Sequence, residues 1–539
     1  MRNKSYELYE LPIIADLNDM IVLKKNSNPN GIAFSFYQGK NIITKTYHQF
    51  YEDVQSISFF LQSKGIEEKH IALVGENSYE WICTFFAIVN TGNVAVLIDK
   101  ELPEQEIHTL IINADVQSVF YSNAYKEFIE GQNTEKDIFS FNHFQTYTKM
   151  GIDFAKNTNG LLLSSEINVD KMCCIMFTSG TSGKNKCVML SQRNIVEDIN
   201  GSCQLFKLEG DTVALLPFHH AFGLVVGVLM PFHYGFRIHI NKSLKTIMRS
   251  LQDIRPQTLF LVPLFIENFS KLIWKSAKEK KLSDKLEKTI KINQLLLKVG
   301  IDFRKVLFRS VREQFGGNLR YIICGGAKLE RQYITEFRNF GREILNGYGT
   351  TECSPCVAVN RNYYHKDGSV GIKIPKSEIM ISEDREVLIR GNHVMLGYYN
   401  NSEETEKVII NGWYHTGDLG YIDKDGFIYL IGRKKNLIIR SNGENVSPEE
   451  IESDFYKDDF VSEVIVYEKK GKIVAEIYPE NEMLEQSEDR QVIYFDKLKN
   501  KVNKDRPLYK QVANIVIRKE EFKKNTSKKI IREYGKESR

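Results

Sequence analysis

The first third of the chain alternates between two patterns of apolar positions. Apolar side chains recur at helical spacing in three segments, 47–64, 79–90 and 104–113. Short continuous apolar runs fall between and after them, at 70–74, 94–98 and 116–121. Such runs predict buried strands, and strands that alternate with helices predict a mainly parallel sheet with helical crossovers.

Later apolar runs meet glycine-rich turns and predict further strands, at 172–177, 213–216, 321–324 and 344–345. From Gly368 onward the pattern changes to short strands at 387–390, 414–419 and 427–431. These predict β-hairpins, one of them turned by Asp425-Gly426. Strands at 464–467 and 473–478 follow in a lysine-rich region. The charged, turn-prone run 432–436 predicts a domain linker, with the boundary near Lys435.

Residues 266–315 form a long, lysine-rich segment with helical periodicity. Leu282, Leu286 and Ile290 fall on one helix face, and charged residues lie opposite. This pattern predicts a helical insertion that faces solvent, and its charge requires no function beyond solvation.

Composition narrows the class of protein. A chain of 539 residues exceeds one hydrophobic core, so we expect at least two domains. With 73 basic and 69 acidic residues, the charge is too balanced for nucleic acid to be the main partner. The N-terminus lacks an apolar signal-peptide core, and the longest apolar run, near 221–232, is too short to span a bilayer. We therefore expect a cytoplasmic protein without a transmembrane segment, and both a monomer and a homodimer remain open.

The eight cysteines are scattered and are expected to be reduced thiols. Cys353 and Cys356 form a C-x-x-C pair, but a zinc site would need a second ligand pair at suitable spacing. The sequence has no such pair, so we expect neither metal binding nor redox chemistry from these thiols.

The stretch 177–191, FTSGTSGKNKCVMLS, concentrates glycines, hydroxyls and lysines between two apolar runs. Glycines let the backbone approach a ligand, and backbone N–H groups, hydroxyls and lysines can then surround an anionic group. This chemistry suits a polyphosphate. The stretch is not the common P-loop, which has four residues between its first glycine and the Gly-Lys-Ser/Thr. A polar surface turn is the alternative interpretation of such a cluster.

Three other turns at strand ends carry candidate ligand-binding groups, because α/β sheets bind ligands where strands end. Residues 217–223 contain the adjacent pair His219-His220, which faces a ligand or, alternatively, forms ordinary hydrogen bonds in a loop. The turns 325–327 and 346–352 combine small residues with a strand end. Glu352 adds a carboxylate, and Mg²⁺ is usually bound by one or two carboxylates together with phosphate oxygens.

Four stretches together resemble the adenylate-forming superfamily, which includes acyl-CoA synthetases, firefly luciferase and the adenylation domains of peptide synthetases. They are the glycine-rich stretch, NGYGTTE at 346–352, YHTGDLGYIDKDGFIYLIGR at 414–433 and NTSKKI at 525–530, in the family's order and over nearly the whole chain. The resemblance implies an α/β fold with two domains. Residues 1–434 would form a large domain of mainly parallel sheets with helical crossovers and a β-rich subdomain, and residues 435–539 a small, mobile α+β domain.

The resemblance also implies how ATP would be bound. The phosphates would be held by residues of the glycine-rich stretch, Thr178, Ser179, Gly180, Thr181, Ser182, Gly183 and Lys186. The adenine slot would be lined by Gly325, Gly326, Ala327 and the stacking ring of Tyr348, and Gly349 would also belong to the nucleotide site. Asp418 and Arg433 would bind the ribose hydroxyls.

Catalytic roles follow from the same resemblance. Thr351 would contact the α-phosphate, Glu352 would hold Mg²⁺, and His220 would lie beside the substrate carboxylate. Lys529 would be the mobile catalytic lysine and Lys435 the hinge. Asn442 and Gly443 would lie near the thiol channel.

Three features depart from the family's pattern. Asn185 and Cys187 stand where proline and glycine are usual, which would change the stiffness of the phosphate loop. Lys528 stands where glycine is usual, and Lys529 is taken as the catalytic lysine because it directly precedes Ile530. The turn RSNGEN at 440–445 is one residue longer than in some members.

The implied reaction is ATP- and Mg²⁺-dependent activation of a carboxylic acid to an acyl-adenylate, followed by transfer to a thiol. Residues 304–329 and the helical insertion before them resemble long-chain fatty acyl-CoA synthetases most, which implies a medium- to long-chain fatty acid and CoA. The phosphopantetheine arm of an acyl carrier protein is the alternative acceptor. A non-catalytic nucleotide-binding protein of the same fold is a further alternative, against which the intact Glu352, Asp418, Arg433 and Lys529 argue.

Overall fold

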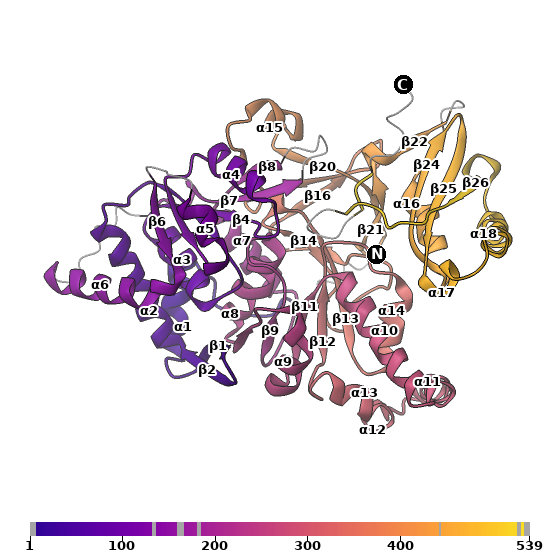
Figure 1. Ribbon diagram of the computed structural model, residues 1–539, viewed down its shortest axis with the longest axis horizontal. Coiled ribbons are helices and arrows are strands. Elements are labelled where there is room, and N and C mark those ends of the chain that lie inside the picture. Colours follow the sequence, from indigo (N-terminus) through magenta and orange to yellow (C-terminus); the bar gives the residue numbers. More distant parts are fainter. Residues whose placement is uncertain are drawn as a thin grey trace. The chain divides into compact units, whose positions relative to one another are not determined.

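The computed structural model describes residues 7–131, 136–158, 167–179, 185–440, 444–524 and 530–532, with Ser179 described by its backbone alone. The chain forms two compact units (Figure 1). The first comprises Met1–Ile379, Ile389–Tyr414 and Gly426–Ile428, and the second comprises Met380–Leu388, His415–Asp425 and Tyr429–Arg539. Each unit has a hydrophobic core of its own.

A seven-stranded sheet with helical crossovers lies in the first unit. Its strands, in sheet order, are β18 (Gly397–Tyr398), β8 (Asn185–Ser191), β7 (Met172–Ser179), β4 (Val94–Ile98), β3 (His70–Val74), β5 (Ser118–Tyr121) and β6 (Asp137–Ser140). The last five of these strands run parallel, and β8 and β18 are antiparallel to their neighbours. Helix α2 (Tyr47–Ser63) precedes β3, and the helices between successive strands are α3 (Tyr79–Asn90), α4 (Glu104–Asn113), α5 (Lys126–Glu130) and α6 (Phe144–Asn157). The alternation predicted over 47–121 is confirmed.

Local sequence signals explain where these elements begin. Thr46 and Gln49 form a capping box at the start of α2, and Ser78 caps α3 by accepting from the backbone N–H of Trp81. Strand β4 is buried at all five positions. Parallel strands are buried on both faces, so a continuous apolar run marks them better than alternation does.

Two smaller sheets complete the architecture of the first unit. One has the order β2 (Asn41–Thr46), β1 (Ile32–Gln38), β10 (Ile238–Ile240) and β9 (Thr212–Ala214). The other has the order β11 (Thr258–Leu261), β12 (Tyr321–Cys324), β13 (Glu343–Gly349), β14 (Cys356–Val359) and β15 (Ile372–Lys373). Strands β11, β12 and β13 run parallel, so their carboxyl ends meet at one edge. Further helices are α1 (Leu17–Ser27), α7 (Gln192–Cys203), α8 (Met230–Tyr234), α9 (Ile247–Ile254), α14 (Arg331–Asn339) and α15 (Ser402–Val408).

Short strands dominate between residues 378 and 433, as the sequence predicts. The sheet order is β16 (Glu378–Ile381), β17 (Glu386–Arg390), β20 (Trp413–Ile422) and β19 (Ile409–Ile410), and β21 (Ile428–Arg433) also pairs with β20. The hairpin predicted at Asp425-Gly426 is therefore confirmed. Gly426 has φ +86°, a conformation that favours glycine at this turn.

The second unit contains a separate α+β arrangement after residue 436. Strand β22 (Ile438–Ile439) pairs with β23 (Asn445–Val446), and a three-stranded sheet has the order β24 (Val461–Lys469), β25 (Lys472–Pro479) and β26 (Val512–Ile517). Its helices include α16 (Pro448–Phe455), α17 (Asn481–Leu484) and α18 (Glu488–Asn503). The predicted α/β fold class is confirmed. Residues 429–434 belong to this unit, so the units do not divide at Lys435, and a hinge there stays a prediction.

The lysine-rich segment is only partly the solvent-facing insertion that the sequence predicts. It folds into α10 (Pro263–Glu279), α11 (Ser283–Lys298), α12 (Arg304–Leu307) and α13 (Arg309–Gln314). Helix α10 buries Ile266, Phe269 and Ile273 in the core of the first unit, and Leu286 and Ile290 of α11 pack against that core. The prediction fails for α10 because its apolar stripe covers the cluster beneath strands β11 and β12.

Within the described residues, no helix combines the length and the apolar character needed to cross a membrane. Each of the eight cysteines is a free thiol. Burial raises the pKa of Cys353 and disfavours the thiolate that metals and oxidants require.

Candidate active site

Strands β7 and β8 carry the two ends of the glycine-rich stretch. They pair antiparallel, with Thr178 opposite Lys186 and Ser179 opposite Asn185. The intervening residues, Gly180, Thr181, Ser182, Gly183 and Lys184, lie outside the described residues, as does the side chain of Ser179. The structure therefore fixes where this loop leaves and re-enters the sheet, beside the carboxyl end of β4.

Lys186 has two partners that the sequence does not suggest. Its Nζ lies 2.8 Å from Oε2 of Glu404 on α15 and 4.6 Å from the centre of the Tyr398 ring. Hydrogen bonds from Lys186 and Lys407 lower the pKa of Glu404 to about 2, so this carboxylate is ionised at neutral pH. Contact with an anion and with the face of an aromatic ring holds the ammonium beside the loop.

Tyr398 connects this lysine to the predicted magnesium ligand. Its hydroxyl donates to Oε1 of Glu352 at 3.0 Å, and the backbone N–H of Met395 donates to the Glu352 carbonyl oxygen at 2.8 Å. Burial and the neighbouring Glu352 raise the pKa of Tyr398, which keeps the phenol protonated and able to donate. The side chain of Glu352 is thus held in place while remaining partly exposed. One carboxylate, completed by phosphate oxygens, is a donor set that fits Mg²⁺.

The predicted adenine slot lies at the carboxyl ends of β12 and β13, which are parallel neighbours. Gly325 is buried, and a Cβ there would lie 3.2 Å from the ring of Phe222, so glycine leaves room for that ring. A Cβ on Gly349 would overlap the carbonyl oxygen of Pro355, so packing alone explains this glycine. Gly326 and Ala327 are exposed, and Tyr348 is 9% exposed. Thr351 begins the short 3-10 turn that carries Glu352.

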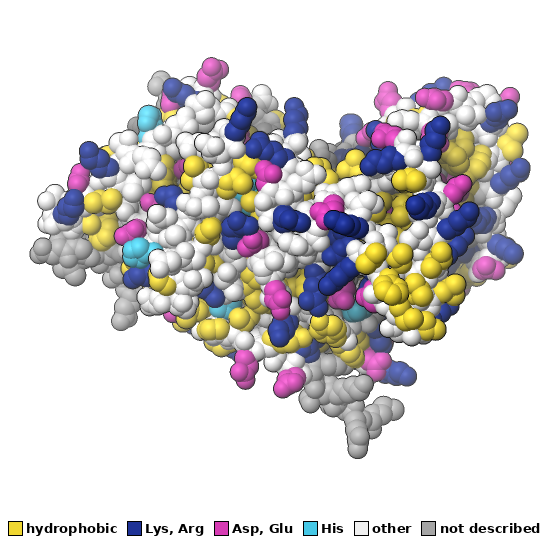
Figure 2. Space-filling view, turned by 90° about the horizontal axis from the view of Figure 1, so that it is seen from below, with side chains coloured by type: hydrophobic (Ala, Val, Ile, Leu, Met, Phe, Trp, Pro, Cys, Tyr) yellow, Lys and Arg dark blue, Asp and Glu magenta, His cyan; other side chains and the backbone are white. Residues whose placement is uncertain are grey.

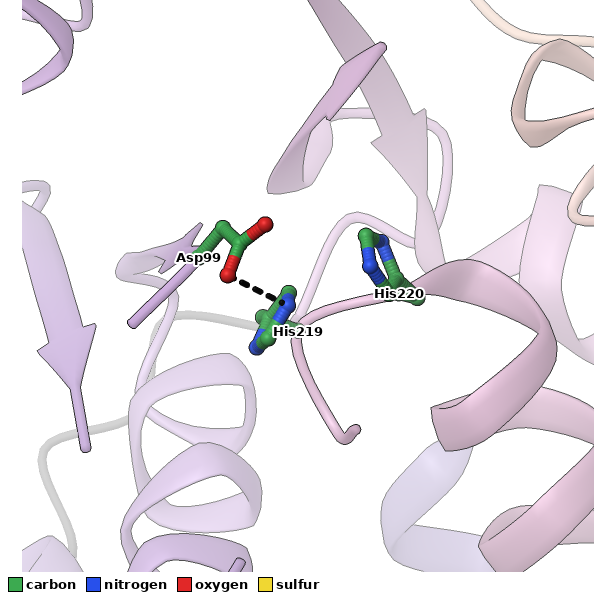
Figure 3. Close-up of side chains that lie close together, drawn as sticks. All are labelled: Asp99, His219 and His220. Carbon is green, nitrogen blue, oxygen red and sulfur yellow. Dashed lines mark ion pairs between the residues drawn. The ribbon is translucent and has the colours of Figure 1, made fainter. Parts of the chain in front are cut away.

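Figure 3 shows Asp99 with the two adjacent histidines. Asp99 follows β4, and the histidines precede the π-helical segment Phe222–Leu229. Oδ1 of Asp99 lies 3.1 Å from Nε2 of the buried His219, a contact that is an ion pair when the imidazole is protonated. The ring centroids of His219 and His220 are 4.3 Å apart. The ligand atoms of the three residues lie within 4.8 Å of one another, a composition that also suits a transition metal. The sequence alone does not single out Asp99, since it lies 120 positions before His219.

Asp418 and Arg433 lie together in the second unit, and their shared role at the ribose stays a prediction. Nε of Arg433 is 2.7 Å from Oδ1 of Asp418, and its Nη1 donates to the carbonyl oxygen of Thr416 at 3.1 Å. The pairing of β20 with β21 brings these distant sequence positions side by side.

The predicted hinge also lies in the second unit. Burial, with Arg433 and Arg532 nearby, lowers the pKa of Lys435. The neighbouring Lys434 pairs with Asp384 at 2.6 Å and with Glu386 at 2.9 Å. Asn442, Gly443, Lys528 and Lys529 lie outside the described residues, and their roles stay predictions.

Comparison with known sequences assigns the chain to a family. A profile of the AMP-binding enzymes matches residues 24–399, which contain Lys186, Tyr348 and Glu352. The chain belongs to the AMP-binding enzyme family. A long-chain-fatty-acid–CoA ligase of Mycobacterium bovis is 25% identical over 443 residues, covering 77% of this chain and 73% of its own length. A 2-succinylbenzoate–CoA ligase of Listeria innocua is 25% identical over 441 residues, covering 80% and 82%.

A solved structure supports the fold of this AMP-binding enzyme. The o-succinylbenzoate CoA synthetase of Bacillus subtilis, solved with its acyl-adenylate intermediate, has a TM-score of 0.73 at 21% identity. The match covers 96% of this chain and 98% of that one. The fold is therefore that of the adenylate-forming ligases.

Proposed function

We propose that this AMP-binding enzyme is an acid–thiol ligase, which activates a carboxylic acid as an acyl-adenylate and transfers the acyl group to CoA. The observation that carries the proposal is that one residue, Tyr398, contacts both Lys186 and Glu352. An ammonium beside the phosphate loop and a carboxylate suited to Mg²⁺ are the groups that a bound triphosphate requires.

In the first step the acid oxygen attacks the α-phosphorus of ATP, and pyrophosphate leaves. Lys186 and the loop from Thr178 would hold the β- and γ-phosphates, and Thr351 the α-phosphate. Glu352 would hold Mg²⁺, which when bound neutralises charge on the phosphate oxygens. Such a transfer needs little covalent catalysis, because positioning of the reactants and neutralisation of the phosphate charge stabilise its transition state. Glu404 would then release Lys186 to the nucleotide, since a polyphosphate offers the lysine more negative charge than one carboxylate.

His220 would lie beside the substrate carboxylate. The contact of Asp99 Oδ1 with His219 Nε2, at 3.1 Å, would help to keep the two adjacent imidazoles in place. Asp418 and Arg433 would bind the ribose, and Gly325, Gly326, Ala327 and Tyr348 the adenine.

In the second step the thiol attacks the acyl carbon, and AMP leaves. Lys529 would serve only the first step, and turning about Lys435 would exchange it for the thiol channel near Asn442 and Gly443. A medium- to long-chain fatty acid is the proposed substrate. Its support is the resemblance of residues 304–329 to long-chain fatty acyl-CoA synthetases, together with the relative that is a long-chain-fatty-acid–CoA ligase.

Pyrophosphate release over a panel of acids tests this function. We expect release from ATP only when Mg²⁺ and an acid are both present, with the highest rate for fatty acids. A panel that includes o-succinylbenzoate and benzoate separates fatty from aromatic substrates. Release of orthophosphate and ADP would contradict adenylation, and nucleotide binding without any release would favour the non-catalytic alternative.

The identity of the thiol that accepts the acyl group is tested with the acid that gives the highest rate of pyrophosphate release. CoA should yield acyl-CoA together with free AMP. Accumulation of acyl-AMP in the presence of CoA, followed by discharge to a holo carrier protein, would favour the carrier-protein alternative.

Tyr398→Phe tests whether the tyrosine positions Glu352. The variant removes the hydroxyl that donates to Glu352 and keeps the ring beneath Lys186. We expect the Mg²⁺ concentration that half-saturates nucleotide binding to rise about 10- to 100-fold, because a hydrogen bond to a charged group contributes about 1.5–3 kcal/mol. Nucleotide binding without Mg²⁺ should change little. Tyr399→Phe is the matched control, since its hydroxyl bonds to Asp115 instead, and an equal effect there would refute the role of Tyr398.

A further inference from the structure

Helix α11 exposes a second apolar stripe that the core does not use. Its inner face contains Leu286, Ile290 and the fully buried Asn293. The outer face follows steps of three and four residues, which place side chains one above another, through Lys285, Lys288, Ile292 and Leu295, and Val299 continues it directly after the helix. Leu295 is 63% exposed and Val299 70%. The outer face is therefore basic in its first half and apolar in its second.

The apolar surface continues beyond α11. Ile301, Phe303, Val306 and Leu307 are all exposed, and Val306 reaches 73%. Seven large apolar side chains thus lie open within sixteen residues of sequence, Ile292, Leu295, Val299, Ile301, Phe303, Val306 and Leu307. Single exposed apolar residues are ordinary, but a group of this size marks an interaction site. We call these seven residues the α11–α12 patch.

Positive charge is concentrated around the same patch. Residues 263–309 contain twelve Lys and Arg against five Asp and Glu, whereas the rest of the chain contains 61 against 64. The net charge of the protein therefore comes from this segment. Figure 2 shows hydrophobic side chains gathered on this side of the first unit, with Lys and Arg around them.

We propose that the α11–α12 patch docks the enzyme on the surface of an anionic lipid bilayer. Apolar side chains enter the boundary between headgroups and acyl chains, and lysines beside them remain with the anionic headgroups. Charge complementarity selects this partner, because cations near an anionic leaflet strengthen such binding and apolar area alone binds weakly. The enzyme lies on the membrane, in agreement with the lack of a spanning helix among the described residues.

The proposal does not depend on the identity of the acid, although a fatty acid dissolved in a bilayer would gain a short route to the enzyme. Binding can be measured without ATP or acid, so failure of the proposed function and failure of membrane docking are distinguishable.

Co-sedimentation of the full chain with vesicles tests the proposal. We expect binding to vesicles of phosphatidylcholine with phosphatidylglycerol, little binding to phosphatidylcholine alone, and release by salt. The variant Leu295→Ser/Val299→Ser/Val306→Ser and the variant Lys285→Gln/Lys288→Gln should each weaken partitioning by about 10- to 100-fold. Loss in the lysine variant should be largest at low salt.

Controls separate docking from a general effect of surface changes. Leu244→Ser/Leu508→Ser removes exposed apolar side chains elsewhere and should bind like the parent protein. Unchanged circular dichroism and thermal unfolding would show that each variant folds. Equal binding by all variants would overturn the proposal. The proposal would also be overturned if the parent protein associated with itself without lipid, or captured a partner protein, and only the apolar variant lost this binding. The patch would then be a protein interface.

Discussion

Lys529→Ala is expected to slow adenylate formation by at least about 10²–10³-fold, because one preorganised charge beside the developing phosphate charge contributes that much. Thioester formation from supplied acyl-AMP should continue at nearly the normal rate, since no charge builds on the α-phosphate when a thiol attacks the acyl carbon. Single-turnover kinetics on each half-reaction, with acyl-AMP as the starting material for the second, measure the two effects separately.

Lys435→Pro provides the opposite comparison. Proline fixes φ and removes a backbone N–H, so it should stiffen the 3-10 turn Lys434–Asn436 and hinder the rotation that admits the thiol. This variant should therefore retain adenylation and lose thioester formation. Equal slowing of both steps by Lys529→Ala would mean that the lysine has a structural role or that Lys528 is the catalytic lysine. Lys528→Ala is accordingly the control.

Glu352→Gln is expected to reduce pyrophosphate release by about 10²–10³-fold, because it removes the charge that would hold Mg²⁺ at the phosphates. The amide keeps an oxygen that can accept from Tyr398, so the local packing is retained. A Mg²⁺ titration of nucleotide binding should show weaker metal dependence, and this measurement does not rely on turnover.

Glu403→Gln is the matched control for that change. Glu403 lies on α15 with a side chain 82% exposed and pairs with Lys407 at 2.7 Å, so losing its charge should leave both activity and Mg²⁺ dependence unchanged. Near-normal pyrophosphate release by Glu352→Gln would remove Glu352 from the proposed metal site. The proposed acid–thiol ligase would then need a different carboxylate.

Local patterns in the sequence determined the elements and the family. The segments 70–74, 79–90, 94–98 and 104–113 coincide with β3, α3, β4 and α4, because apolar periodicity and caps such as Ser78 act over a few residues. The motif 346–352 is recognisable from the sequence for the same reason. Its turn needs glycine at Gly349 whatever binds there, and Glu352 stands within it.

Tertiary structure decided which distant groups meet. Tyr398 reaches Glu352 across 46 positions, and Lys186 reaches Glu404 across 218, so no spacing rule could pair them. Asp99 joins His219 for the same reason, since β4 and the turn before Phe222 meet only in the folded chain. Helix α11 shows most clearly that tertiary packing decides which side chains are exposed. Its sequence offers two apolar stripes, and only docking of Leu286 and Ile290 on the core leaves Ile292, Leu295 and Val299 facing outward.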